Sequence, residues 1–557
     1  MLLPPILREY QYYILGALLF LTTLLNKYRR RTRNPRGLPL PPGPKGYPFI
    51  GCLTIMPKDD PWLVYDQWSK TYGDLLYFEV LGQPFLILGS LHRTHEIFQK
   101  RSTIYSDRPQ MPMIVDLMGW DFILGFRNYG PWWKKQRKLF HEYFNASAVT
   151  QYRPIQLDEV HDFLRRLSEN PDDLFKHIRL LVAAIIQRIC YGAKVESLDH
   201  PFVRNAEAAL AGVSEAGIPG RFLVDVMPIL KYVPEWFPGA SFRKRARVWR
   251  EINEKVADLP FEAVKERLNN GTQLAPSVAS SLIDKLPEKG HPDREEEEHH
   301  ANRVSAVAYL AIKIDSLQAR QTRYAHSNTL QLFYLSHQIF MKKQTNSTMQ
   351  TFFLSMLLHP NAMKKAQAEI DRVVGSSRLP DFSDRHSLPY VSAIIKESAR
   401  WHVGVNLGIA HCSSEDDEYE GYFIPKGTIV MGNAWSILHN PETYPNPEEF
   451  IPERFLDLKD GQLNPDVRDP GCATFGYGRR ICPGQHLAQE TLFITIASTL
   501  ALFDILPPLD EAGNPIETKA KFTSTLLSDR SPLPFKCRIV PRTAERITLI
   551  HNVMDSK

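Results

Sequence analysis

One short stretch, residues 475–484, combines residue types that could hold a reactive thiolate. Cys482 lies two residues after Arg480 and just before a Pro-Gly step, and the apolar run Gln485–Leu502 predicts a helix directly behind it. The first N–H groups of a helix and the positive end of its dipole stabilise negative charge on sulfur. An arginine two residues earlier can reach an anionic group on a bound partner. The stretch therefore predicts an activated cysteine that ligates a bound group, and an inert buried cysteine in a glycine-rich turn is the alternative.

The same stretch resembles the FxxGxRxCxG signature of the cytochrome P-450 haem-thiolate enzymes. Every fixed position of that signature matches, at Phe475, Gly478, Arg480, Cys482 and Gly484. The resemblance implies that Cys482 is the axial thiolate ligand of the iron of haem b, where a thiolate favours O–O cleavage. It also implies that Arg480 neutralises a haem propionate and that Phe475 packs near the sulfur.

Two further segments carry residues that the resemblance assigns to the same cofactor. Trp133 and Arg137 lie four positions apart where the sequence opens a helix, so they share one face; surface packing with a basic stripe is the alternative. A Trp-xxx-Arg pair at this place in the family contacts a haem propionate. His411 falls where a His or Arg of the family often binds the second propionate, and an ordinary polar strand end is the alternative. Neighbouring lysines could face an acidic redox partner: Lys134, Lys135 and Lys138.

A Glu-x-x-Arg pair at Glu397 and Arg400 is by itself a common surface pair on a helix. Together with the downstream Pro452–Phe455, which reads Pro-Glu-Arg-Phe, it resembles the family's structural ion network. The resemblance implies that Glu397, Arg400 and Arg454 stabilise the fold behind the haem and are not catalytic.

Residues 302–311 and 345–354 read as two halves of one small-residue helix that Ile312–Gln344 interrupt. In the family one long helix crosses the distal face of the haem and carries an acid–alcohol pair that relays protons to bound oxygen, but this sequence lacks the motif. A long loop inside a packed element argues against a simple helix. Three explanations stay open: a mistranslated intron or wrong splice junction, a real insertion in which Asp315 and Ser316 replace the pair, or a member that does not activate oxygen.

Charge and apolar runs predict the domain organisation. The chain has 557 residues and a net charge of +5. Its basic excess clusters in residues 1–36, so no basic face for nucleic acid is expected. Scattered cysteines favour a reducing compartment without disulfides. The apolar residues 10–25 and the basic residues that follow predict a signal anchor over residues 1–34, with a cleaved signal peptide as the alternative. A Pro-rich hinge over 35–50 and a catalytic domain over 51–545, with an atypical insertion at 312–344, complete the prediction.

Several elements are expected to position the site. Residues 75–81 and 85–88 predict a hairpin around a Gly-Gln-Pro turn. The segments 104–130 and 403–410 are apolar yet irregular, which is typical of pocket walls. The proline-rich apolar segment 219–239 predicts membrane contact. The run at 295–300, Glu-Glu-Glu-Glu-His-His, is interpreted as a solvated loop.

The resemblance implies a mainly α fold with a small β-region near the N-terminal half: one catalytic domain of the cytochrome P-450 fold behind an N-terminal membrane anchor. It implies a monooxygenase of secondary metabolism that hydroxylates an apolar terpenoid, polyketide or aromatic compound with O2 and electrons from NADPH-cytochrome reductase. The resemblance also implies a single-pass protein of the endoplasmic reticulum membrane, and the positive-inside rule predicts that its catalytic domain lies in the cytosol. The alternatives are an oxygen-independent isomerase or dehydratase of the same fold, a haem-binding form inactivated by the insertion, and a thiolate-ligated haem sensor or carrier.

Overall fold

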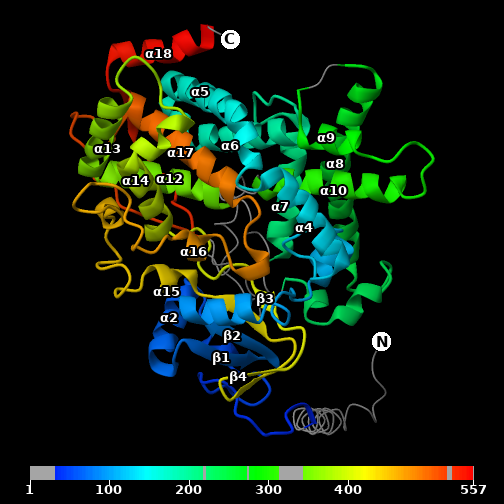
Figure 1. Ribbon diagram of the computed structural model, residues 1–557. Coiled ribbons are helices and arrows are strands. Elements are labelled where there is room, and N and C mark those ends of the chain that lie inside the picture. Colours follow the sequence, from blue (N-terminus) through cyan, green and yellow to red (C-terminus); the bar gives the residue numbers. More distant parts are fainter. Residues whose placement is uncertain (1–31, 218–220, 273–274, 313–342, 524–529, 556–557) are drawn as a thin grey trace.

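The structure is a computed structural model that describes residues 32–217, 221–272, 275–312, 343–523 and 530–555. Within these ranges the chain is mainly helical, and its small sheets lie together at one end (Figure 1). The helices are α2 Pro61–Tyr72, α3 Leu91–Thr94, α4 Pro131–Phe144, α5 Arg153–Glu169, α6 Leu174–Tyr191, α7 Pro201–Ala216, α8 Ser241–Asn269, α9 Val278–Asp284, α10 Arg294–Ile312, α12 Lys343–Leu358, α13 Pro360–Val373, α14 Pro389–Trp401, α15 Ala434–Leu438, α16 Gly471–Thr474, α17 Gln485–Leu502 and α18 Ala544–Asp555.

The helix behind the cysteine loop is the centre of the helical layer. α17 begins at Gln485 and ends at Leu502, as the sequence predicts, and its side chains are buried from Thr491 to Leu502. A helix that is apolar on every side has to lie inside the protein. α17 packs against α5, α12, α13 and α14, so the end of the cysteine loop is held by the core of the domain.

The main sheet combines strands from both halves of the chain. β1 (Leu75–Val80) and β2 (Gln83–Leu88) form the predicted antiparallel hairpin. β2 also pairs in parallel with β6 (Ile429–Gly432), and β6 pairs antiparallel with β3 (His411–Cys412). The prediction of a β-region near the N-terminal half is therefore incomplete, because long-range pairing brings C-terminal strands to the hairpin. The remaining pairs are β4 (Asp417–Tyr419) with β5 (Tyr422–Ile424) and β7 (Phe503–Leu506) with β8 (Arg538–Pro541).

The interpretation of residues 295–300 as a solvated loop is wrong, because α10 begins at Arg294 and includes them. Three glutamates occupy the first turn of α10, where the helix dipole favours negative charge. His300 is buried and its Nδ1 lies 2.5 Å from Nε2 of Gln136 on α4. Packing against α4 thus stabilises a helix in a segment whose charged sequence is typical of a solvated loop.

The two halves of the interrupted helix are both present as packed helices. α10 and α12 each pack against α6, and Figure 1 shows them on either side of the centre of the molecule. Leu310 near the end of α10 and Asn346 near the start of α12 are buried. The candidate residues Asp315 and Ser316 lie outside the described residues.

The Pro-rich segment after residue 34 is attached to the domain by backbone hydrogen bonds. The carbonyl of Pro39 accepts the N–H of Phe423, and the carbonyl of Pro42 accepts the N–H of Tyr77. Across the described ranges, no helix has the length and apolarity that crossing a bilayer requires. The predicted anchor at residues 10–25 precedes the described part of the chain.

A buried ion network joins α14 to the segment after it. The Glu397 carboxylate accepts hydrogen bonds from Nε and Nη2 of Arg400 at 2.7 and 2.8 Å and from Nε of Arg454 at 3.2 Å. The side chains of Glu397 and Arg400 are completely buried, and the carboxylate also accepts the N–H of Ile451. This is the structural network that the sequence predicts, and it lies away from the cavity described below.

Substitution of Glu397 by alanine is expected to lower the free energy of unfolding by about 3–5 kcal/mol, because two arginines lose their buried counter-ion. Urea unfolding monitored by circular dichroism measures this change. Glu420→Ala, which removes an exposed partner of Arg93, is the matched control and should cost less than about 1 kcal/mol. Equal losses in the two variants would contradict the structural role of Glu397.

Candidate functional site

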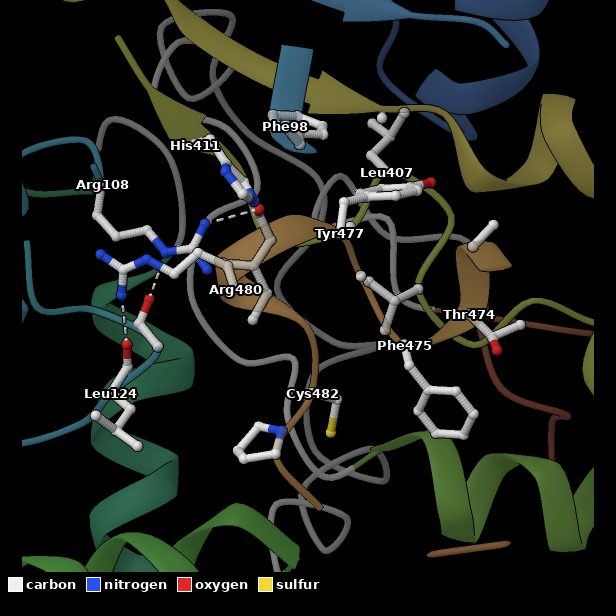
Figure 2. A pocket seen from close by; sticks show the side chains of 18 of the residues that line it. Phe98, Arg108, Leu124, Leu407, His411, Thr474, Phe475, Tyr477, Arg480 and Cys482 are labelled. Atoms are coloured by element: carbon white, nitrogen blue, oxygen red, sulfur yellow. Dashed lines mark hydrogen bonds between the residues drawn. The ribbon is translucent and has the colours of Figure 1, made fainter. Parts of the chain in front are cut away.

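A cavity beside the cysteine loop collects the cofactor-binding residues that the sequence predicts. It encloses about 770 Å³ of empty space including its mouth. Figure 2 shows the side chains around it, which come from the cysteine loop, from β3 and from segments near residues 98, 108 and 124. The predicted residues in its wall are Cys482, Arg480, Phe475, Trp133, Arg137 and His411.

Local backbone geometry brings Cys482 to the wall. Gly476 and Gly478 adopt φ angles of +77° and +55°, which favour glycine. A Cβ at Gly478 would lie 2.1 Å from the carbonyl oxygen of Phe98, so no other residue fits there. The N–H of Cys482 donates to the carbonyl of Phe475 at 2.7 Å, which closes the loop just before α17.

The electrostatic setting of the sulfur differs from the expectation based on the helix start alone. Burial raises the pKa of the Cys482 thiol, while the N–H of Gly484 and the charge of Arg137 act in the opposite direction. The sequence argument counts the helix dipole and omits the cost of removing a thiolate from water. A bound metal ion reverses this balance, because a coordinating thiol is deprotonated.

Two buried arginines stand side by side in the wall. Nε, Nη1 and Nη2 of Arg480 donate to the carbonyls of residues 106, 124 and 127 at 2.7–2.9 Å. Arg108 donates to the carbonyls of residues 125, 409 and 410 at 2.7–3.0 Å. Burial lowers the pKa of Arg480 to about 9, with Arg137 contributing. Burial and the neighbouring Arg480 also lower the pKa of Arg108 well below its ordinary value.

Trp133 and Arg137 of α4 complete this positively charged wall. The indole Nε1 of Trp133 donates to the carbonyl of Leu124 at 3.1 Å, and the Arg480 guanidinium lies 4.4 Å from the ring centre. Arg137 makes no hydrogen bond or ion pair with any described residue, and burial lowers its pKa. Within the described ranges, none of Arg108, Arg137 and Arg480 is paired with a carboxylate.

The wall therefore fits an anionic, flat cofactor with a metal centre. Three arginines line one cavity, and none of them forms an ion pair with a carboxylate among the described residues. The Asp107 carboxylate acts on Arg108 and Arg480 from a longer distance and offsets only part of the fall in pKa that burial causes. Buried charge of one sign is costly unless an anion neutralises it. A single thiol supplies a soft ligand, and no group of three or more His, Cys, Asp or Glu side chains that could hold a metal ion occurs in the described part. These features match haem b, whose two propionates are anionic and whose iron takes one axial thiolate.

Some residues of the wall escape prediction from the sequence. Arg108, Phe98 and Tyr477 line the cavity, although nothing in their local spacing assigns them to it. The available signal for Arg108 is an arginine inside the largely apolar segment 104–130, which it shares with Arg127. The segment 403–410, expected to face a pocket, contributes Val405, Leu407, Gly408 and Ile409.

The lysines of α4 do not form one free surface. Nζ of Lys135 lies 2.9 Å from a carboxylate oxygen of Glu297 on α10, so this lysine joins two helices. Lys134 lies over the ring of Tyr129, 5.0 Å from its centre. Lys134 and Lys138 are exposed and stay candidates for contact with an acidic partner.

Comparison with known proteins agrees with the geometry. The cytochrome P-450 family model matches residues 41–313 and 331–531. The chain is 47% identical over 521 residues to cytochrome P-450 monooxygenase COX2 of Coprinopsis cinerea, covering 94% of this chain and 93% of that protein. It is 43% identical to COX1 of the same fungus, covering 95% of this chain and 96% of that protein. Tryptamine 4-monooxygenase of Psilocybe cyanescens is 38% identical, with 93% of this chain and 95% of that protein covered. The cavity, its thiol and these matches together show that the chain belongs to the cytochrome P-450 family, whose members bind haem b through a cysteine thiolate.

Proposed function

We propose that this protein hydroxylates an apolar small molecule with O2 and electrons that derive from NADPH. The observation that carries the proposal is the half-buried thiol of Cys482 in a cavity lined by three arginines. Haem b, when bound, supplies the oxygen activation and the transfer of one oxygen atom into a C–H bond. Cys482 would ligate its iron, Arg108, Arg137 and Arg480 would neutralise its propionates, and His411 would bind a propionate.

The residues of the wall would position the cofactor and exclude water from the cavity. The guanidinium groups of Arg108 and Arg480 are held by backbone carbonyls on both sides of the cavity, so they are oriented before the cofactor binds. Val405, Leu407 and Ile409 present apolar side chains that keep water out. Water exclusion strengthens electrostatic contacts inside the site.

The substrate is proposed to be an aromatic, terpenoid or polyketide metabolite. The apolar character of the segment 104–130 supports this class, although these residues lie outside the wall of the described cavity: Met111, Met113, Ile114, Leu117 and Phe122. A relative named for its action on tryptamine supports the aromatic option. Incubation with reductase, NADPH and a panel of such compounds under labelled dioxygen tests the proposal, and one labelled oxygen atom in the product is the expected result.

The same assay separates the other readings of the sequence. Product formed without NADPH or O2 would support the isomerase or dehydratase reading and overturn hydroxylation. Ligand-induced spectral changes with no turnover of any compound would support a sensor or carrier. The relatives are named monooxygenases, which favours the first reading.

We infer that the protein acts at the endoplasmic reticulum membrane and receives electrons from NADPH-cytochrome reductase in the cytosol. The segment around η6 (Leu223–Asp225) and η7 (Pro228–Tyr232) supports contact with lipid, because large apolar side chains are exposed on it. The exposed side chains are Leu223, Met227, Ile229, Tyr232, Trp236 and Phe237.

Substitution of both Ile229 and Trp236 by serine is expected to weaken binding to phospholipid vesicles at least about tenfold. Each apolar side chain that no longer enters lipid removes about 1.5–3 kcal/mol of binding free energy. Vesicle sedimentation of a chain that begins at Thr32 measures this effect without residues 1–31. Leu458→Ser is the matched control, because Leu458 is 97% exposed but stands apart from this segment. Unchanged binding of the double variant would argue against lipid contact at this segment.

A further inference from the structure

One buried aromatic ring connects two parts of the cofactor site that lie far apart in the sequence. Phe98 belongs to η2 (His95–Lys100) and is 1% exposed. Its ring centre lies 4.1 Å from that of His411, and 5.4 Å from that of Tyr477 with the two rings nearly parallel at 21°. Figure 2 shows Phe98 near the ring of His411 and the ring of Tyr477, at one end of the cavity.

The backbone of Phe98 also touches the cysteine loop. Its carbonyl oxygen fills the place that a Cβ on Gly478 would occupy, so the loop and η2 are in direct contact. The Tyr477 ring also packs against Gly432, where an added Cβ would lie 2.6 Å from a ring atom of Tyr477. Phe98 therefore contacts the loop that carries Cys482 through both its ring and its main chain.

Two of the contacts that hold His411 are with its neighbours Tyr105 and Phe98. Its Nδ1 lies 2.7 Å from the carbonyl oxygen of Tyr105. The Phe98 ring, packed with its centre 4.1 Å from that of the imidazole, restricts tilting of the imidazole plane. Aromatic pairs of this kind are worth about 0.5–1.5 kcal/mol beyond the area they bury.

We propose that Phe98 is a positioning residue that sets the plane of His411 and supports the cysteine loop, so that both meet the haem in the correct orientation. This inference rests on the proposed function, because it takes His411 as a ligand of a haem propionate. Phe98 lines the cavity at the end where His411 and Tyr477 lie. Its effect passes through His411 and through the loop.

A double-mutant cycle on the holoprotein tests the proposal. Phe98→Leu keeps most of the apolar volume and removes the ring face, and His411→Ala removes the group that the ring positions. The readouts are the rate of haem transfer to apomyoglobin and the haem reduction potential. We expect Phe98→Leu to speed haem release about two- to tenfold, as the loss of one aromatic pair predicts, and to shift the potential in the same direction as His411→Ala.

The combined variant should release haem at nearly the rate of His411→Ala, because both changes act on one group. The small remaining difference in rate would come from the contact of Phe98 with the cysteine loop. Phe98→Tyr, which keeps the ring face, should retain the release rate and potential of the unchanged protein. Phe85→Leu is the matched control. Phe85 is as buried as Phe98, lies on β2 in the sheet that also contains His411, and stacks on Phe78 at 5.2 Å, but it lies outside the cavity wall. It should lower the midpoint of urea unfolding and leave both haem readouts unchanged.

The positioning role would be overturned if Phe98→Leu left the haem release rate and the potential unchanged. It would also be overturned if the release rate of the combined variant were the product of the two separate increases. Loss of both haem readouts in Phe98→Tyr as severe as in Phe98→Leu would overturn it too. Failure of the proposed function is distinguishable from failure of the positioning role. If the unchanged protein shows thiolate–haem absorption with carbon monoxide but hydroxylates nothing, hydroxylation fails while the haem readouts still test Phe98. If the unchanged protein shows no such absorption, haem binding itself fails and the positioning role is overturned with it.

Discussion

Cys482→Ser is expected to abolish the thiolate–haem absorption with carbon monoxide and to reduce the rate of hydroxylation by more than about 100-fold. Even residues that only hydrogen-bond to a metal ligand lower metal affinity or activity by about 10- to 100-fold when they are replaced, and Cys482 is the ligand itself. The serine side chain is nearly the same size, so the loop that Gly476 and Gly478 shape should keep its fold. Difference spectroscopy of the reduced protein with carbon monoxide gives the first readout. Product formation with reductase and NADPH gives the second.

Cys472→Ser is the matched control for this substitution. Cys472 belongs to the short helix α16, ten residues before Cys482, and burial raises the pKa of its thiol to about 11. It lies outside the cavity wall, so this variant should keep both the absorption and the turnover of the unchanged protein. A normal carbon monoxide spectrum in Cys482→Ser would remove Cys482 as the ligand and the central support of the proposed function.

Removal of Ile312–Gln344, with a Gly-x-Asp-Thr link in their place, is expected to raise hydroxylation about 100-fold or more. A positioned proton donor and acceptor contributes about 10²–10⁴-fold to such steps, and the motif that carries the acid–alcohol pair in the family is absent from this sequence. α10 and α12 both pack on α6, and Leu310 and Asn346 near their ends are buried. Each half therefore has a fixed place in the fold, and the short link tests whether joining them restores the relay.

The control for this deletion has the same link length with alanine in place of Asp and Thr. It should bind haem as well as the restored form and show no gain in turnover, which separates the effect of the proton relay from that of a shorter helix. Equal turnover of the full-length and restored proteins would show that the interruption does not limit activity. Sequencing the transcript across Ala311–Thr345 tells whether the protein made in the cell contains the segment.

Much of the local structure follows from patterns that are visible in the sequence. The bounds of α17 agree with the prediction because its 18-residue apolar run is too long for an ordinary strand and satisfies its own backbone hydrogen bonds as a helix. The β1–β2 hairpin follows from alternating apolar residues around a turn at Gly82. Trp133 and Arg137 reach the same cavity because four residues make about one helical turn. In each case neighbours along the chain carry the information.

Other features depended on contacts between distant segments. The glutamate-rich start of α10 was interpreted as a loop, and the packing of His300 against Gln136 makes it a helix. The sheet was expected near the N-terminal half, yet β6 and β3 join it from residues beyond 410. The pKa of the Cys482 thiol rises because the whole site is buried, a cost that the local argument from the helix dipole omits.

Patterns along the chain identify Cys482 as the ligand, with Arg480 and one face of α4 beside it. Motif spacing carries this information because these residues lie within one loop or one helical turn. The joint place of Arg108 and Arg480 in the wall, and the packing of Phe98 against His411 and Tyr477, come from the tertiary fold. Residues 98 and 411 have no relation in spacing, and their contact forms when strand pairing closes a long loop, so burial and orientation there are properties of the whole fold.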